Sequence, residues 1–364
     1  MEITQKPINE QVMVITGASS GIGLVTSKLA AQKGACVVLA ARNERDLARA
    51  VEEIRAAGGR AVYQVADVAD ATQVQRIAET ATREFGRIDS WVNNAAVAVY
   101  GRLTEVSLDD MRRQFDVNYW GQVYGSLAAV RYFGREGGTL INVASALADR
   151  AIPLQGNYSA AKHALKAFTD TLRMELEEAG IPISVSLVKP GSIDTPLFDK
   201  AKTYLEVEPQ PVPPVYAPEV VAETILHCAQ HPVRDIVVGG MGKMLGVAAT
   251  FPRLADRYME RTTFESQKTD KPTIDRPNNL YESVEADGGE RGSNWSGRTK
   301  ETSLYTAAAL HPGITAVAAG VGLGLLAGAV VRRFASRTTA SDRLSDESGI
   351  RTDQASDATT SVRT

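Results

Sequence analysis

The sequence predicts an α/β fold, with a doubly wound parallel sheet of seven strands and a C-terminal extension. From Val12 to about Gly240, short apolar runs rich in β-branched residues alternate with longer helical stretches. These runs are apolar nearly throughout rather than at every second position, which is typical of strands buried on both faces. Strands regularly separated by helices favour a parallel sheet with right-handed crossovers.

The predicted strands are short, and most are followed by a helical stretch. In chain order they are VMVIT (12–16), CVVLA (36–40), AVYQVAD (61–67), DSWVNNA (89–95), TLINVAS (139–145), ISVSLVKP (183–190) and DIVVGG (235–240). Glycine, the residue that most readily ends a helix, closes the helical stretches between the first four strands. These stretches cover 23–34, 45–59 and 71–86.

Composition excludes several classes of protein. The chain has 364 residues, of which 44% are hydrophobic, so it can bury a sizeable core. The net charge of -3 shows no basic excess, and we expect no nucleic-acid partner. Cys36 and Cys228 stand in apolar stretches and are expected to be buried thiols, and the four scattered histidines indicate no metal site. The N-terminus lacks a signal-peptide pattern, which predicts a cytoplasmic catalytic part.

The character of the chain changes after Gly240. We divide the sequence into a catalytic domain (1–250), a polar extension or linker (251–312), a transmembrane or membrane-inserted helix (313–333) and a disordered tail (334–364). The extension is polar, with scattered Pro and Gly and no clear periodicity, and we expect a helical start that fades into a linker. The tail is rich in Ser, Thr, Asp and Arg.

An apolar stretch, Ile314–Val331, predicts membrane association. It holds eighteen residues without a charge, or about 27 Å of helix, the lower limit for crossing a bilayer. Gly324 and Gly328 form a G-x-x-x-G step that would let two such helices approach. A buried Ala/Gly-rich helix is the alternative. The orientation of a membrane-spanning helix here stays open. The arginines after the apolar stretch favour a C-terminal flank in the cytoplasm, but the catalytic domain before it also belongs in the cytoplasm, and one span cannot place both flanks there.

A glycine-rich turn lies between the first strand and the first helix. Its spacing, Thr-Gly-x-x-x-Gly-x-Gly, is set by Thr16, Gly17, Gly21 and Gly23. Residues without a Cβ let the backbone turn sharply and let a pyrophosphate approach the helix N-terminus, where free N–H groups point outward. The turn, with a strand before it and a helix after it, therefore predicts a dinucleotide site.

The chain resembles the short-chain dehydrogenase/reductase family over roughly residues 8 to 245. The resemblance rests on the glycine turn and on further motifs in the family's order, namely Asp67-Val68, NNAA at 93–96, Asn118, Ser145, Tyr158 with Lys162, and Pro190-Gly191 with Thr195. It implies a Rossmann-like fold and hydride transfer with a nicotinamide cofactor. It also implies a homodimer or homotetramer, with the helices of Asn118 and Tyr158 at the interface. Ala96 departs from the family's usual glycine.

We expect the cofactor to be NADP(H), with NAD(H) as the alternative. An NAD site places a carboxylate after the second strand, where this chain has Ala41 and Arg42, and a guanidinium there could hold a 2′-phosphate. Arg42 could instead be a solvated residue, with Arg45 replacing it or sharing the role. The predicted cofactor-binding residues are Gly17, Ser19, Ser20, Gly21, Ile22, Gly23, Arg42, Asp67, Val68, Asn94, Ala95, Tyr158, Lys162, Pro190, Gly191 and Thr195.

The family resemblance implies specific contacts for several of these residues. Asp67 would hydrogen-bond the adenine amino group beside Val68, although it could also cap a helix, for which Asp70 is better placed. Asn94 and Ala95 would support the central strand and line the ribose. Thr195 would bind the nicotinamide carboxamide.

The predicted catalytic residues are Asn118, Ser145, Tyr158 and Lys162. Tyr158 and Lys162 are four residues apart, which places them on one face of a helix, and an ammonium there would lower the pKa of the phenol. Tyr158 would move the proton and Ser145 would donate a second hydrogen bond to the substrate oxygen. By resemblance, Asn118 would kink its helix and support a proton relay to Lys162. Taken alone, Ser145 could be a turn serine, and Asn118 a surface asparagine.

We therefore expect an NADP(H)-dependent oxidoreductase acting on a carbonyl or a secondary alcohol. The variable lid at 196–217 contains Leu197, Phe198, Tyr204 and Leu205, and Leu147, Ile152 and Leu154 follow Ser145, which favours an apolar substrate. The rival class is a non-catalytic nucleotide-binding scaffold at a membrane. Epimerisation or dehydration is a third possibility that no residue specifically supports.

Overall fold

The computed structural model of the chain describes residues 5–240, 251–273, 277–285, 288–311, 313 and 315. The chain divides into two units, Met1–Leu310 and His311–Thr364, and every helix and strand with described bounds lies in the first. Within the described residues, no helix combines the length and apolar character needed to cross a membrane. The membrane segment predicted at 314–331 falls, apart from Thr315, outside the described residues, and it stays a prediction.

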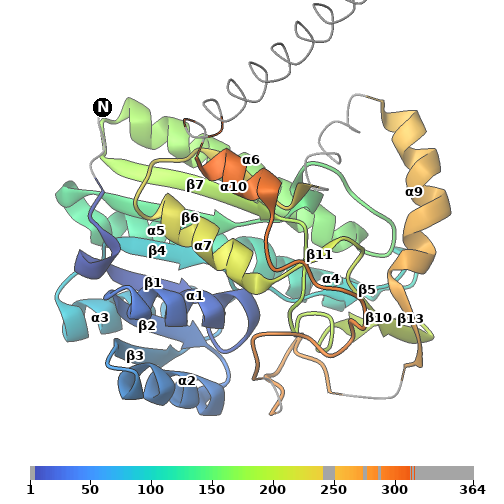
Figure 1. The fold of residues 1–364 in the computed structure, drawn as a ribbon, viewed down its shortest axis with the longest axis horizontal. Coiled ribbons are helices and arrows are strands. Elements are labelled where there is room, and N and C mark those ends of the chain that lie inside the picture. Colours follow the sequence, from blue (N-terminus) through green and yellow to red (C-terminus); the bar gives the residue numbers. More distant parts are fainter. Residues whose placement is uncertain are drawn as a thin grey trace, which may run out of the picture. The chain divides into compact units, whose positions relative to one another are not determined.

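A parallel seven-stranded sheet forms the centre of the first unit (Figure 1). All neighbouring strands run parallel, which confirms the predicted architecture. From one edge to the other the strands are β12 (Asp235–Val238), β7 (Ile183–Pro190), β6 (Gly138–Val143), β4 (Ser90–Asn93), β1 (Val12–Thr16), β2 (Cys36–Ala41) and β3 (Arg60–Val65). The chain order reverses direction in the sheet between β1 and β4, and a cleft for ligands is expected beyond their carboxyl ends.

Helices cover both faces of the sheet, so its strands are apolar on both sides. One face packs against α1 (Gly21–Gln32), α2 (Glu44–Ala56) and α7 (Pro218–Cys228). The other packs against α3 (Ala71–Phe85), α5 (Gly121–Phe133) and α6 (Gly156–Glu178), and α4 (Leu108–Phe115) packs beside α6. Successive residues of β1 show the division, since Met13 and Ile15 belong to the first core and Val14 to the second.

Local signals in the sequence set several helix ends. Asp70 caps α3 by accepting hydrogen bonds from the N–H groups of Thr72 and Gln73, as expected for the better-placed of the two aspartates. Gly86 ends the same helix in the left-handed region, with φ of 78°. Cys36 and Cys228 are buried, unpaired thiols in the core.

Short strand pairs and the C-terminal extension complete the unit. The pairs are β5 (Val99–Tyr100) with β9 (Lys202–Thr203), β8 (Ser192–Ile193) with β11 (Val215–Tyr216), and β10 (Val207–Pro209) with β13 (Lys268–Pro272). The extension also contributes α9 (Pro252–Ser266) and α10 (Leu304–Leu310). Described parts of the extension pack on the catalytic domain, where scattered buried residues such as Leu280 anchor them.

Candidate active site

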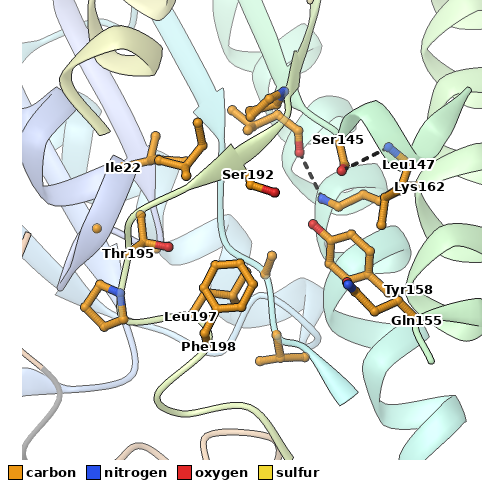
Figure 2. Close-up of a pocket in the computed structure, with 18 of the residues that line it drawn as sticks. Ile22, Ser145, Leu147, Gln155, Tyr158, Lys162, Ser192, Thr195, Leu197 and Phe198 are labelled. Atoms are coloured by element: carbon orange, nitrogen blue, oxygen red, sulfur yellow. Dashed lines mark hydrogen bonds between the residues drawn. The ribbon is translucent and has the colours of Figure 1, made fainter. Parts of the chain in front are cut away.

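A cavity of about 550 Å³ lies beyond the carboxyl ends of the sheet strands (Figure 2). Residues from the ends of β1, β2, β4, β6 and β7 line it, together with the lid and the extension. All but one of the predicted cofactor-binding residues line this cavity. The exception is Gly23, which lies in the first turn of α1 and does not line the cavity. The structure thus brings together motifs that are spread over about half of the chain.

The glycine turn is shaped for close approach of a ligand. Gly17 has φ of +67°, a backbone conformation that other residues rarely adopt. A Cβ on Gly23 would lie 2.2 Å from the carbonyl oxygen of Gly17, so no side chain fits there. Asn94 fixes the turn to the end of β4, because its Nδ2 donates to the carbonyl of Thr16 at 2.9 Å. This bare, fixed backbone at the start of α1 fits the pyrophosphate of a dinucleotide.

The end of the cavity near β2 and β3 differs from the expected arrangement. The guanidinium of Arg42 donates through Nη1 to the carbonyl of Tyr281 at 2.8 Å and through Nη2 to that of Asn279. The carboxylate of Asp67 accepts from the N–H of Ala69 at 3.0 Å and pairs with Arg113. Both side chains line the cavity, but their strongest polar contacts are within the protein. Their predicted contacts with a cofactor stay predictions.

Three of the predicted catalytic side chains meet in the middle of the cavity. Tyr158 and Lys162 come from α6, and Ser145 follows β6. Figure 2 shows the Tyr158 hydroxyl, the Ser145 hydroxyl and the Lys162 ammonium turned toward a common space. The Nζ of Lys162 lies 5.7 Å from the centroid of the Tyr158 ring and donates to the carbonyl of Val143 at 2.9 Å. The Oγ of Ser145 accepts from the N–H of Leu147 at 3.1 Å, which leaves its own hydrogen available for donation.

Burial dominates the electrostatics of these groups. It raises the pKa of Tyr158 to about 12, while a hydrogen bond with Ser145 lowers the pKa. Burial also lowers the pKa of Lys162 to about 7. The lowering of the Tyr158 pKa by Lys162 stays a prediction, and burial works against it because desolvation disfavours the phenolate.

Asn118 lies behind the cavity and is fully buried. It stands in a π-helical turn, Asp116–Trp120, that joins α4 to α5, so the long predicted helix is interrupted at this residue. Its Oδ1 accepts from the N–H of Val97 and its Nδ2 donates to the carbonyl of Val97, both at 2.9 Å. The side chain thereby fixes the helix to the segment after β4, and it is no surface asparagine.

The far end of the cavity is lined by α9, which contributes both apolar and hydroxyl side chains. Met259 of α9 packs in one cluster with Leu147, Ile152 and Tyr158. Leu197 and Phe198 of the lid line the same space, as the sequence predicts. Tyr204 instead donates to the carboxylate of Asp110 at 2.7 Å and supports the lid from below.

Several cavity residues were not predicted from the sequence. They are Tyr258, Met259, Thr262, Thr263 and Ser266 of α9, Asn279 and Ser283 further along the extension, and Lys200 of the lid. The extension lacks any motif, and its polar composition suggests solvent exposure. The only available signal was a short helical start followed by isolated apolar residues, which does not reveal where a segment docks.

Comparisons with known proteins agree with this site. The sequence profile of the short chain dehydrogenase family matches residues 11–205. An uncharacterized oxidoreductase of Bacillus subtilis (strain 168), YxnA, is 45% identical over 332 residues, which cover 90% of this chain and 92% of the relative. The chain therefore belongs to the short-chain dehydrogenase family of oxidoreductases, and the similarity to the relative extends through most of the extension.

Solved structures share the fold. A short-chain dehydrogenase/reductase from Burkholderia phymatum in complex with NAD has a TM-score of 0.59 at 27% identity, covering 75% of this chain and all of that one. An alcohol dehydrogenase from Thermococcus sibiricus complexed with 5-hydroxy-NADP has a TM-score of 0.55 at 25% identity, covering 62% and 95%. One neighbour holds an NAD and the other an NADP derivative, so the likeness does not distinguish between the two cofactors.

Proposed function

We propose that this protein is an NADP(H)-dependent oxidoreductase that interconverts a carbonyl compound and a secondary alcohol. The observation that carries the proposal is the convergence of Tyr158, Ser145 and Lys162 on one cavity that continues to the glycine turn of α1. The first three residues offer proton transfer and hydrogen bonding, and the turn offers a dinucleotide site. A non-catalytic scaffold would not need this arrangement.

The proposed mechanism assigns each side chain a task. A bound nicotinamide supplies or accepts the hydride. In reduction, Tyr158 gives its proton to the carbonyl oxygen as negative charge develops there, and Ser145 donates a hydrogen bond to the same oxygen. In oxidation, the phenolate of Tyr158 takes the alcohol proton. Because Tyr158 is nearly fully buried, water competes little for these contacts.

Lys162 and Asn118 support proton transfer by Tyr158 in the proposed mechanism. When Lys162 is protonated, its charge favours the phenolate of Tyr158, and its hydrogen bond to Val143 fixes its position. Asn118 holds the π-helical turn beside the segment after β4, and we propose that this turn supports the proton relay to Lys162. The task of Asn118 is therefore to position other groups.

The residues at the end of β2 support a preference for NADP(H) over NAD(H). Ala41 ends that strand and Arg42 follows it, so no carboxylate occupies the position that would accept a ribose hydroxyl and repel a 2′-phosphate. Arg42 contributes positive charge to this end of the cavity, although its terminal nitrogens bind the extension.

An apolar substrate is supported by the walls of the cavity beyond Tyr158. Leu147, Ile152 and Met259 belong to one apolar cluster at the cavity, and Phe198 of the lid also lines the cavity. Such a pocket favours a bulky apolar ketone or alcohol over a small polar one, because burial of apolar surface is the main available source of binding energy.

A homodimer or homotetramer and a cytoplasmic site of action remain part of the proposal. Large apolar side chains are exposed on the two helices expected at an interface, namely Trp120 and Leu127 at α5 and Met174 on α6. The free thiols Cys36 and Cys228 suit a reducing compartment. Light scattering of the purified chain measures the assembly.

Tyr158→Phe tests the mechanism. The variant keeps the ring and its packing but has no proton to transfer, so we expect NADPH affinity near that of the wild type. Turnover of ketones should fall by at least about 10²-fold. NADPH fluorescence measures binding, and NADPH absorbance during incubation with a panel of ketones and alcohols measures turnover.

Tyr124→Phe is the matched control, since Tyr124 lies on α5 away from the cavity, and its turnover should not change. Full turnover by Tyr158→Phe would refute the mechanism. If the wild type binds NADPH tightly and reduces nothing in a broad panel, the scaffold function is favoured instead.

A further inference from the structure

A segment of the extension, residues 277–285, contributes to the cavity at the ends of β2 and β3. Asn279 and Ser283 of this segment line the cavity together with Arg42, which follows β2, and Asp67, which lies just after β3. The family profile matches residues 11–205, so the segment lies outside the matched residues. Its contribution to the cavity is therefore a feature of this chain that the family motifs do not describe.

Side chains of the catalytic domain hold the backbone of this segment in place. The guanidinium of Arg42 donates to the carbonyls of Asn279 and of Tyr281. Arg113 donates through Nε to the carbonyl of Leu280 at 3.0 Å, and the side chain of Leu280 is fully buried. Because these contacts involve the backbone on both sides of Asn279, they fix the position from which its side chain extends.

The side-chain oxygen of Asn279 has no hydrogen-bond partner among the described residues. This Oδ1 is buried, and Asn279 lines the cavity. The backbone groups of the same residue are satisfied, since its N–H donates to the carbonyl of Lys200 at 3.0 Å and its carbonyl accepts from Arg42. A buried acceptor without a donor is unfavourable, and folded proteins rarely leave one unpaired. The Asn279 oxygen is therefore available to a donor on a ligand in the cavity.

The position of Asn279 indicates which ligand would supply this donor. Ser145 follows β6, whereas Arg42, which binds the Asn279 carbonyl, follows β2, three strands further across the sheet. Three strand spacings are about 14 Å, so one small ketone cannot contact both ends. A dinucleotide can, because it binds across the point where the strand order reverses. With the nicotinamide beside Ser145, the adenosine half lies toward Asn279.

We propose that Asn279 is a cofactor-binding residue whose Oδ1 accepts a hydrogen bond from the adenosine half of the dinucleotide. This inference rests on the proposed function, because it requires that the cavity hold a nicotinamide dinucleotide. Two kinds of group in adenosine can donate, namely the amino group of adenine and a ribose hydroxyl. The extension then takes part in cofactor binding as well as in the substrate pocket.

Asn279→Leu tests the proposal, because leucine has nearly the shape of asparagine and carries no polar side-chain atom. The affinity for NADPH, measured by isothermal titration, should fall about five-fold or more, the usual effect of losing a hydrogen bond in a buried site. In calorimetry without nucleotide, the melting temperature of the variant should equal or exceed that of the wild type, because an unpaired buried oxygen is removed. A purely structural role of Asn279 would lower the melting temperature instead.

An NADPH analogue with hypoxanthine in place of adenine identifies the donor. The analogue has an oxygen where adenine has its amino group, so it cannot donate from that position. If the amino group is the donor, the wild type should bind the analogue more weakly than NADPH, and Asn279→Leu should bind the two equally. If a ribose hydroxyl is the donor, Asn279→Leu should lose affinity for both nucleotides by the same factor.

Glu282→Gln is the control, because Glu282 is exposed on the same segment and does not line the cavity. Its affinities should match those of the wild type. Asn279→Ala serves as a second variant if Asn279→Leu does not fold. Wild-type affinity for NADPH in either folded variant, or a loss of affinity in Asn279→Leu together with a lower melting temperature, overturns the inference and leaves the proposed function intact. If the wild type binds no nicotinamide dinucleotide, both the inference and the proposed function fail.

Discussion

Lys162 shows the conflict between function and stability in a single residue. It is 1% exposed, and its Nζ has one hydrogen bond with a backbone carbonyl. A buried ammonium is costly because it has lost most of its hydration, and this cost is why its pKa falls to about 7. Replacement by an apolar residue should therefore stabilise the fold while it impairs proton transfer by Tyr158.

Lys162→Met should raise the melting temperature, and the gain should depend on pH. The pKa of Lys162 is about 7 in the folded protein, and its ordinary value is 10.5. Between these values the unfolded chain binds a proton that the folded chain does not, so Lys162 makes the wild type more stable as pH rises. The gain from Lys162→Met should thus be largest below about pH 7 and vanish toward about pH 10.5.

Calorimetry of the wild type and of Lys162→Met across this pH range measures the difference. Because other titrating groups are common to both proteins, the difference isolates Lys162. A gain that does not change with pH would show that Lys162 has the same pKa in the folded and unfolded chains, contrary to this account.

At the scale of elements, α9 decides the shape of the substrate pocket. The helix belongs to the extension, yet Met259 packs on Tyr158, and Gln267 just after the helix accepts from Gln155 at 2.7 Å. These contacts hold a wall of the pocket that the sheet and its crossover helices do not supply. The extension should therefore affect substrate choice more than it affects the chemistry at Tyr158.

Met259→Ala should change the preference among substrates of different size. Removal of the Met259 side chain enlarges the apolar end of the cavity. The kcat/KM for small 2-alkanones should therefore fall about ten-fold, and the kcat/KM for long or cyclic ketones should fall less or rise. Steady-state rates with NADPH over a series of 2-alkanones measure this. Leu254→Ala is the control on the same helix, because Leu254 is 70% exposed. Identical size profiles for Met259→Ala and the wild type would exclude α9 as a determinant of specificity.

At the scale of the whole molecule, the chain divides into two units that contain different functional parts. The first, Met1–Leu310, contains the sheet, the cavity and the docked part of the extension. The second begins at His311 and contains the predicted membrane segment at 314–331. If that prediction is right, membrane association and catalysis are separable along the chain.

A chain truncated after Leu310 tests this separation. We expect the truncated chain to keep NADPH binding and to remain in the supernatant after ultracentrifugation, whereas the full chain should sediment with membranes. Activity assays on both fractions provide the control for folding. If the full chain is found in the supernatant as well, the membrane prediction is wrong.

The strands of the sheet were predictable because most of them are apolar nearly throughout, and burial on both faces leaves that mark in the sequence. Ser145, Tyr158 and Lys162 were also predictable to line one cavity, since they follow or flank strand ends in a known order of motifs. The hydrogen-bond partners of Arg42 were not predictable, because they are the backbone carbonyls of Asn279, Leu280 and Tyr281, and backbone groups have no sequence signature. The burial that raises the pKa of Tyr158 was not predictable either, because desolvation depends on the complete cavity.

The sequence by itself predicted the doubly wound sheet from apolar patterning and the glycine turn from local spacing, and it singled out Ser145, Tyr158 and Lys162 through the order of motifs shared with the family. Only the tertiary structure decided that the extension packs against the cavity, that Lys200 reaches the start of α1 and that α9 lines the substrate end. These contacts join segments about 60 to 270 residues apart through isolated side chains and backbone groups. Such pairings depend on the packing of the whole unit, so no short stretch of the sequence carries them.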